Sequence, residues 1–358
     1  MRCTGHPAGS PQRPVAGGPR TNLQRGTPVA GQRNAENDRR SLRIRLGRIV
    51  LHACAAPVNA GVLRRMVVAA WVCLLIAASL GSDVPVMAND GSGGGLLSTL
   101  TSRERREAIA ALPLQRLTPQ ASQKIQRITD KPTIYRRLPT QAIACDRDMF
   151  LFLTRNPEVL VGMWDLMDIT KVAVRRTGAY QLEAQDGSGT TCTIDLVYGD
   201  STTHVFVATG LYDGKLTTSP VRGEGVFMLR SSYAKNSSGG TTVTGTLDCF
   251  IKFDGFGTDL IARTFSGLIG KSADVNFMET SRFVAQVSQA SAVNPGGMVD
   301  VARRLPQVEM ETKKRFAGTI LTVAKRAELA KAGERNGQPR VSPDSSRTAQ
   351  HSGRGDKR

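Results

Sequence analysis

The chain has 358 residues, 40% of them hydrophobic and 22% charged, which is enough for one sizeable core and for extensions outside it. The formal net charge of +18 is concentrated at the ends, since residues 1–88 carry +9, residues 305–358 carry +6 and residues 89–304 only +3. The nearly neutral middle excludes a basic nucleic-acid-binding face from the predicted folded body.

Residues 62–88 have the pattern of a signal peptide. Arg64 and Arg65 precede 15 uncharged apolar residues, 66–80, and Ala88 ends a short stretch suited to signal peptidase. The apolar run is shorter than the roughly 20 residues that span a bilayer. We therefore expect cleavage near Ala88 and export to the periplasm or cell envelope. The alternatives are an uncleaved N-terminal anchor and, with less support, a buried core helix.

Residues 1–61 contain ten arginines and no lysine, and the first lysine of the chain is Lys124. They are rich in Gly, Pro and Arg and have no apolar periodicity. This composition favours a mis-assigned upstream segment, with translation starting at Val62 or Met66. The alternative is a disordered basic arm.

Residues 89–142 are predicted to form a flexible glycine-rich joint and two short helices. The second helix has a clear start, because Thr118 is a good cap and Pro119 suits the first helical turn. Helices this short are not stable alone, so we expect them to pack on the body or on a partner.

Residues 143–300 have the pattern of an α+β domain. A helix is predicted with Asn156 as its cap and Pro157 in its first turn, and its buried stripe comprises Val159, Met163, Leu166 and Met167. Six strands follow, separated by Gly, Asp, Asn and Ser clusters that are typical of antiparallel hairpins, and a long helical pattern from about Asp259 closes the domain. The strands are roughly Lys171–Arg176, Tyr180–Gln185, Thr190–Tyr198, His204–Tyr212, Gly223–Ala234 and Thr241–Phe253.

This order of elements resembles the helix-grip fold of the START-like (SRPBCC) superfamily, over about 150 of the 358 residues. The resemblance implies an antiparallel sheet curved around a long C-terminal helix. It also implies an apolar cavity between them that holds a lipid or another hydrophobic small molecule. Two segments, beginning YRRLPTQAIACDRD at Tyr135 and HVFVATGLYDGK at His204, further resemble exported proteins of planctomycete bacteria, and that resemblance carries over no activity.

Strand alternation places Cys192 and Cys249 on the apolar faces of their strands. A disulfide between these two cysteines is one alternative in an oxidising compartment. Two buried free thiols are the other alternative and are slightly favoured. The candidate cavity residues are Cys192, Ile194, Leu196, Tyr198, Phe227, Leu229, Leu247, Cys249, Ile251, Phe253, Phe283 and Val287.

The sequence offers little for catalysis, and we expect no cofactor and no metal. The chain lacks CxxC, P-loop, GxSxG and HExxH motifs. His204 is the only histidine of the body and is interpreted as a surface or hydrogen-bonded residue. Asp146 and Asp148 are interpreted as helix caps or arginine partners.

Residues 301–332 are predicted to form a basic amphipathic element of one helix or two, with Val308, Phe316, Ile320 and Val323 apolar. Residues 333–358 are predicted to form a disordered basic tail. Two functions are consistent with the sequence. The first is an exported, non-catalytic protein that binds a lipid or hydrophobic small molecule. The alternative is a structural or interaction module of the envelope without a ligand cavity, tethered to an anionic surface by its basic C-terminal segment.

Overall fold

The computed structural model describes residues 94–215, 219–235, 239–254 and 258–337, and for residues 94–100, 258–272 and 334–337 it describes the backbone alone. The predicted upstream segment, 1–61, the predicted signal peptide, 62–88, and residues 338–358 of the predicted tail lie outside the described residues.

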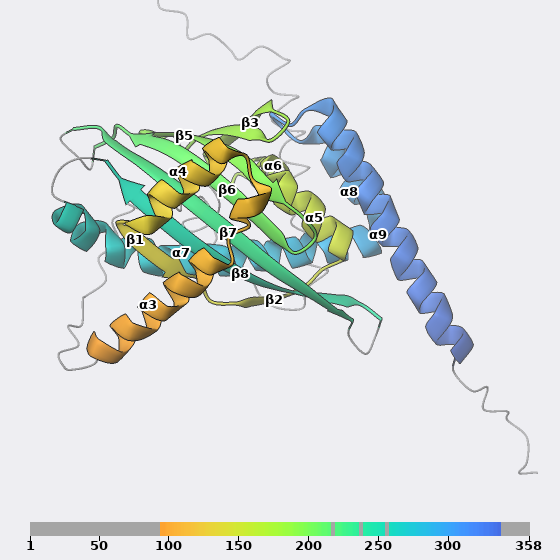
Figure 1. The fold of residues 1–358 in the computed structure, drawn as a ribbon. Coiled ribbons are helices and arrows are strands. Elements are labelled where there is room, and N and C mark those ends of the chain that lie inside the picture. The colour runs from red at the N-terminus through yellow and green to blue at the C-terminus, as the bar shows by residue number, and fades with distance from the viewer. Residues whose placement is uncertain (1–93, 216–218, 236–238, 255–257, 338–358) are drawn as a thin grey trace, which may run out of the picture. The chain divides into compact units, whose positions relative to one another are not determined.

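The described part of the chain is α+β, as predicted, with one antiparallel sheet between two layers of helices (Figure 1). The strand order is β1-β8-β7-β6-β5-β4-β3, and β2 also pairs with β8. Consecutive strands from β3 to β8 pair antiparallel, in agreement with the predicted hairpin loops. The six predicted strands correspond to β3 (Ala173–Gly178), β4 (Gln181–Gln185), β5 (Thr190–Gly199), β6 (Thr203–Tyr212), β7 (Val221–Lys235) and β8 (Thr241–Phe253).

Two further strands bring the sheet to eight within the described residues, so the predicted number of six was too low. β1 (Ile134–Arg137) and β2 (Gln141–Ala144) both pair with β8 and together act as one interrupted edge strand. The interruption falls around Leu138, whose N–H still donates to Leu247 O at 2.9 Å. Proline at the next position cannot donate to the ladder, which explains why the strand is broken there.

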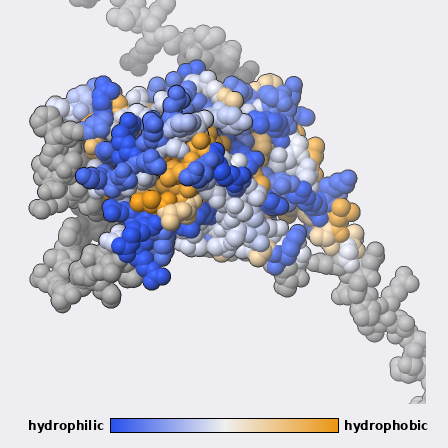
Figure 2. Space-filling view, in the orientation of Figure 1, coloured by the Kyte–Doolittle hydropathy of each residue, from blue (hydrophilic) through white to orange (hydrophobic). Residues whose placement is uncertain are grey.

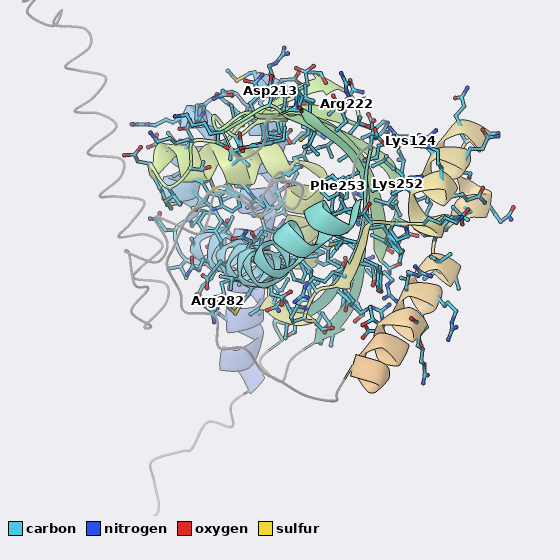
Figure 3. All side chains as sticks on the ribbon, turned by 90° about the vertical axis from the view of Figure 1, so that its left-hand side faces the viewer. Lys124, Asp213, Arg222, Lys252, Phe253 and Arg282 are labelled. Carbon is cyan, nitrogen blue, oxygen red and sulfur yellow. The ribbon has the colours of Figure 1, made fainter. Side chains whose placement is uncertain are left out.

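Helix α7 (Thr258–Val293) lies along the inner face of the sheet, and the sheet curls about it (Figure 3). This arrangement is consistent with a helix-grip fold. From Ala273 onward α7 is part of the inner core, and Arg136 of β1 forms an ion pair with Asp274 that joins the helix to the edge of the sheet. The described α7 side chains in this core are Ala273, Phe277, Phe283, Val284, Val287 and Ala290.

Two more helices, α5 (Arg147–Arg155) and α6 (Pro157–Leu166), complete this inner layer. Asp146 caps α5, since its carboxylate accepts from the backbone N–H groups of Asp148 and Met149 at 2.8 and 3.2 Å. The predicted capping role of Asp146 is confirmed. Helix α5 itself was not predicted as a separate element.

The start of α6 at Pro157 was predicted correctly, but the cap was wrong. The side chain of Asn156 makes no capping hydrogen bond to α6, because its Nδ2 donates instead to Phe152 O of α5 at 2.7 Å. The helix is also buried on all sides from Pro157 to Trp164, so its burial is wider than the predicted stripe. Leu166 and Met167, at its end, are only partly buried.

The outer face of the sheet is covered by α3 (Gly94–Ala110), the short 3₁₀ helix η3 (Leu114–Arg116) and α4 (Pro119–Asp130). Thr118 caps α4 as predicted, its Oγ1 accepting from Ala121 N at 3.3 Å. Apolar surface gathers between the polar outer sides of α3 and α4 (Figure 2). The buried residues of this outer core are Ala108, Leu112, Ile125, Ile128, Val205, Val207, Val226, Met228 and Phe250. The two predicted helices therefore pack on the body, one of the two alternatives. The first of them begins at Gly94, inside the predicted joint, and β1 and the start of β2 also fall within the predicted segment 89–142.

The C-terminal segment forms two helices, α8 (Pro295–Arg304) and α9 (Met310–Gly337), and α9 continues beyond the predicted helical region 301–332 into the start of the predicted tail. Helix α8 crosses the predicted domain boundary at residue 300. The predicted apolar residues Val308, Phe316, Ile320 and Val323 all belong to the inner core, and Phe316 stacks on Phe152 with ring centroids 5.4 Å apart. Helix α9 is therefore part of the folded body.

Candidate functional site

A small cavity lies between the sheet and the helices of its inner layer. Its volume is about 20 Å³, which is room for one or two water molecules. Its walls come from β2, β7, α5, α6 and α7. Seven of its ten lining side chains are apolar, namely Ile143, Phe150, Leu153, Leu160, Leu229, Phe277 and Val284.

The other three lining side chains carry hydroxyl groups. Thr154 lies on α5, and Thr280 and Ser281 lie on α7, where each is at least 94% buried. Hydroxyls both donate and accept, so they can orient one polar group of a molecule held by the apolar walls. None of the three was singled out from the sequence, although Thr280-Ser281 interrupts the apolar pattern of the closing helix and could have been noticed.

Most of the predicted cavity residues lie in the inner core, but only Leu229 lines the cavity. Leu196 is partly buried against that core, and Ile251 is 1% exposed. Phe253 lies partly exposed at the end of β8 (Figure 3). Its ring lies against Gly223 of β7. The members buried in the inner core are Cys192, Ile194, Phe227, Leu229, Leu247, Cys249, Phe283 and Val287.

Tyr198 lies on the opposite face of the sheet from its predicted position. The pairing of β5 with β6 shifts between Leu196 and Tyr198, so that Leu196 pairs with Phe206 and Tyr198 with Val205. A bulge of this kind adds one residue to a strand and reverses the alternation beyond it. Tyr198 therefore packs on the outer core, and the guanidinium of Arg116 lies 5.1 Å from the centre of its ring.

The three described cysteines, Cys145, Cys192 and Cys249, are all buried free thiols. Cys192 lies on β5 and Cys249 on β8, with β6 and β7 between them. Three strand spacings amount to about 14 Å, whereas disulfide-bonded residues have Cα atoms within about 7 Å. The disulfide alternative is therefore wrong. Burial also raises the pKa of the Cys192 thiol, to about 12.

His204 is completely buried at the start of β6 and is hydrogen-bonded, in line with one of the two predicted environments. Arg155, the last residue of α5, donates from Nε to His204 Nε2 at 3.1 Å and from Nη2 to the backbone oxygen of Asp200 at 2.8 Å. Burial, followed by the charge of Arg155, lowers the pKa of His204 to about 4. The imidazole is therefore neutral at neutral pH.

Asp200 and the buried ion pair Arg176–Glu158 both lie next to Arg155, the partner of His204. Burial alone would raise the pKa of Asp200, but hydrogen bonds from the backbone of Thr202 and the hydroxyl of Tyr198 hold it well below its usual range. On the other side, Arg176 donates to both carboxylate oxygens of Glu158, at 2.8 and 3.0 Å, and to the backbone oxygen of Arg155. These contacts tie α5, α6 and β3 together.

No group of three His, Cys, Asp or Glu side chains among the described residues is arranged to hold a metal ion. In the same part of the chain, no helix combines the length and the apolar character needed to cross a bilayer.

No protein-family model matches the chain, and a search of curated proteins finds no match. Solved structures share weak likenesses with it. A conserved protein from Geobacillus kaustophilus is 10% identical over 40% of this chain and 95% of its own, with a TM-score of 0.26. Ara h 8.0201 is 10% identical over 40% and 98%, with a TM-score of 0.24. Dicamba monooxygenase bound to dicamba is 12% identical over 57% and 62%, with a TM-score of 0.29.

TM-scores this low carry no argument about the ligand or activity of the chain. The predicted kinship with exported planctomycete proteins gains no support from these comparisons.

Proposed function

We propose that the protein is an exported, non-catalytic binding protein that holds a hydrophobic small molecule between the sheet and α7, in the manner implied by the START-like resemblance. The observation that carries this proposal is the cavity, whose walls combine seven apolar side chains with three hydroxyls. Mostly apolar walls with a few placed polar groups are typical of ligand-binding pockets.

The size of the cavity limits what enters without movement. Room for one or two waters is far less than a lipid requires, so a larger molecule enters only if α7 moves away from the sheet. The Arg136–Asp274 ion pair links α7 to β1, and its side chains are 38% and 26% exposed. Partly exposed pairs contribute little to stability, about 0–1 kcal/mol, so this link allows such movement.

The proposal is tested by native mass spectrometry of protein purified from its own host, with extraction and identification of any bound molecule. Leu229→Trp fills the cavity and is expected to abolish the adduct. Leu321→Trp, on a position of α9 that is 56% exposed, is the matched control and is expected to keep it. An adduct that persists in Leu229→Trp, or wild-type protein that carries none and gains no thermal stability from hydrophobic ligands, contradicts the proposal.

The small volume of the cavity favours a second candidate, a filled structural or interaction module of the envelope tethered by its basic C-terminal tail. The test must spare α9, because Phe316 and Ile320 are completely buried. Truncation after Gly337 is therefore the appropriate variant, compared with Arg→Gln changes at Arg340, Arg347, Arg354 and Arg358. Loss of envelope association in the truncated protein and in the Arg→Gln variant supports the tether. Unchanged fractionation of the two variants contradicts it.

Export remains a separate part of the proposal. It is supported by the charge and hydropathy pattern of residues 62–88. N-terminal sequencing of the native protein is expected to give a chain that starts at about Asn89. A native N-terminus at Met1 would contradict this part and leave the cavity proposal intact.

A further inference from the structure

His204 lies beside the cavity on the inner face of the sheet. It pairs directly with Leu229 across β6 and β7, and Leu229 forms part of the cavity wall. On the helical side, Thr154, which also lines the cavity, directly precedes Arg155, the partner of His204. His204 itself does not line the cavity, but it is paired with one wall residue, Leu229, and it is hydrogen-bonded to Arg155, the sequence neighbour of another, Thr154.

The hydrogen bond from Arg155 fixes which ring nitrogen of His204 carries the proton. A guanidinium nitrogen only donates, so Nε2 at 3.1 Å from Arg155 Nε must be the acceptor. The ring is neutral at neutral pH, and its single N–H is therefore Nδ1–H. Nδ1 is buried and has no hydrogen-bond partner among the described residues. Buried donors without an acceptor are rare and call for an explanation.

The orientation of the ring directs this donor toward β7, the strand that carries Leu229 of the cavity wall. The Cδ2 edge faces β5, since a Cβ placed on Gly199 would lie 3.2 Å from Cδ2. Nδ1 is on the opposite edge of the imidazole and so faces β7, where the neighbouring side chain on the inner face is Leu229. A shift of the Leu229 side chain would bring a molecule in the cavity within reach of Nδ1–H.

We infer that His204 Nδ1–H is the hydrogen-bond donor for a carbonyl or carboxylate oxygen of the hydrophobic molecule held in the cavity. This inference rests on the proposed function and names the chemical class of the ligand, an apolar molecule with one oxygen acceptor. The guanidinium of Arg155 on the far side of the ring favours such an acceptor, because it strengthens the partial positive charge of the N–H.

Two probes of the same shape test the inference. Acetophenone carries a carbonyl oxygen, and α-methylstyrene replaces that oxygen with a methylene group. Wild-type protein is expected to bind acetophenone about tenfold more tightly, the effect of roughly one hydrogen bond. His204→Phe is expected to lose this preference while still binding α-methylstyrene. Tyr180→Phe, at an exposed position, is the control and is expected to keep the preference.

A measurement on wild-type protein makes the test independent of the folding of the variant. Long-range ¹H–¹⁵N NMR is expected to show His204 as the Nδ1–H tautomer, with the Nδ1 resonance shifted by acetophenone and not by α-methylstyrene. Equal affinities for the two probes, or an unshifted Nδ1 resonance, would overturn the inference and leave the proposed function standing. Failure of both probes to bind would count against the proposed function and the inference together.

Discussion

Arg155 and His204 are joined by a hydrogen bond of 3.1 Å between Nε and Nε2, which holds a guanidinium against a completely buried imidazole. Protonation of His204 would place two positive charges in contact and remove the acceptor of this bond. Of the two hydrogen bonds by which Arg155 attaches α5 to the start of β6 and the loop before it, the one to His204 therefore depends on a neutral imidazole.

The stability of the protein should fall as the pH drops from about 6.5 toward 4. Unfolded His204 takes up its proton near 6.5 and folded His204 only near 4, so between these values the unfolded state binds more protons. The full difference amounts to about 3 kcal/mol. Chemical denaturation at several pH values should show a steeper loss for wild-type protein than for His204→Phe. Parallel curves would contradict the expected role of His204.

Removing one partner of the buried pair Arg176–Glu158 should lower the free energy of unfolding far more than replacing both partners. Arg176→Met leaves Glu158, whose side chain is 1% exposed, without its partner and should lower the free energy of unfolding by about 3–5 kcal/mol. Changing both residues to Met should cost much less. The neighbouring pair Arg175–Glu183 is exposed, and its loss in Arg175→Met should change stability by less than about 1 kcal/mol. Urea denaturation of the four proteins decides the matter.

Strands with long alternating patterns could be predicted from the sequence, whereas short ones could not. The six predicted strands, β3 to β8, each carry apolar residues at every second position over part of their length. β1 and β2 have four residues each, too few to establish a repeat, and all four residues of β1 are half-buried. Their place in the sheet is set by β8, through pairings such as Ile143 with Val243.

The three described cysteines should behave as unreactive thiols in the folded protein. Cys145, Cys192 and Cys249 are buried and unpaired, and only the thiolate reacts with alkylating reagents. Peptide mapping should find all three unmodified after alkylation of native protein and all three modified after unfolding without a reductant. Recovery of a linked Cys192–Cys249 peptide would refute the strand order reported for the sheet.

Helix α9 should contribute to stability through its buried side. Phe316→Ala removes a ring that is 0% exposed and stacked on Phe152, and should cost about 3–5 kcal/mol. Leu321→Ala, on the exposed side of the same helix, should have little effect. Thermal unfolding of the two variants provides the comparison, and similar losses would show that α9 does not pack as described.

The candidate site was less predictable than the fold. Strand alternation correctly placed Leu229 and Leu247 inward, because their strands have no bulge at those positions. Tyr198 was misplaced because the bulge after Leu196 depends on pairing with β6 and leaves no mark in the sequence. The buried environment of His204 includes Arg155, 49 positions earlier in the chain, and could not be predicted from neighbouring residues.

The edge strand has a consequence for folding. Tyr135 of β1 donates a hydrogen bond to Asp248 of β8 at 2.9 Å, although 113 positions separate the two residues. Bringing such distant segments together costs loop-closure entropy before any contact offsets it, and chains dominated by such contacts fold slowly. β1 and β2 have no partner in the sheet other than β8 among the described residues. β1 and β2, the first strands in the chain, can therefore join the sheet only after β8, the last strand, has formed.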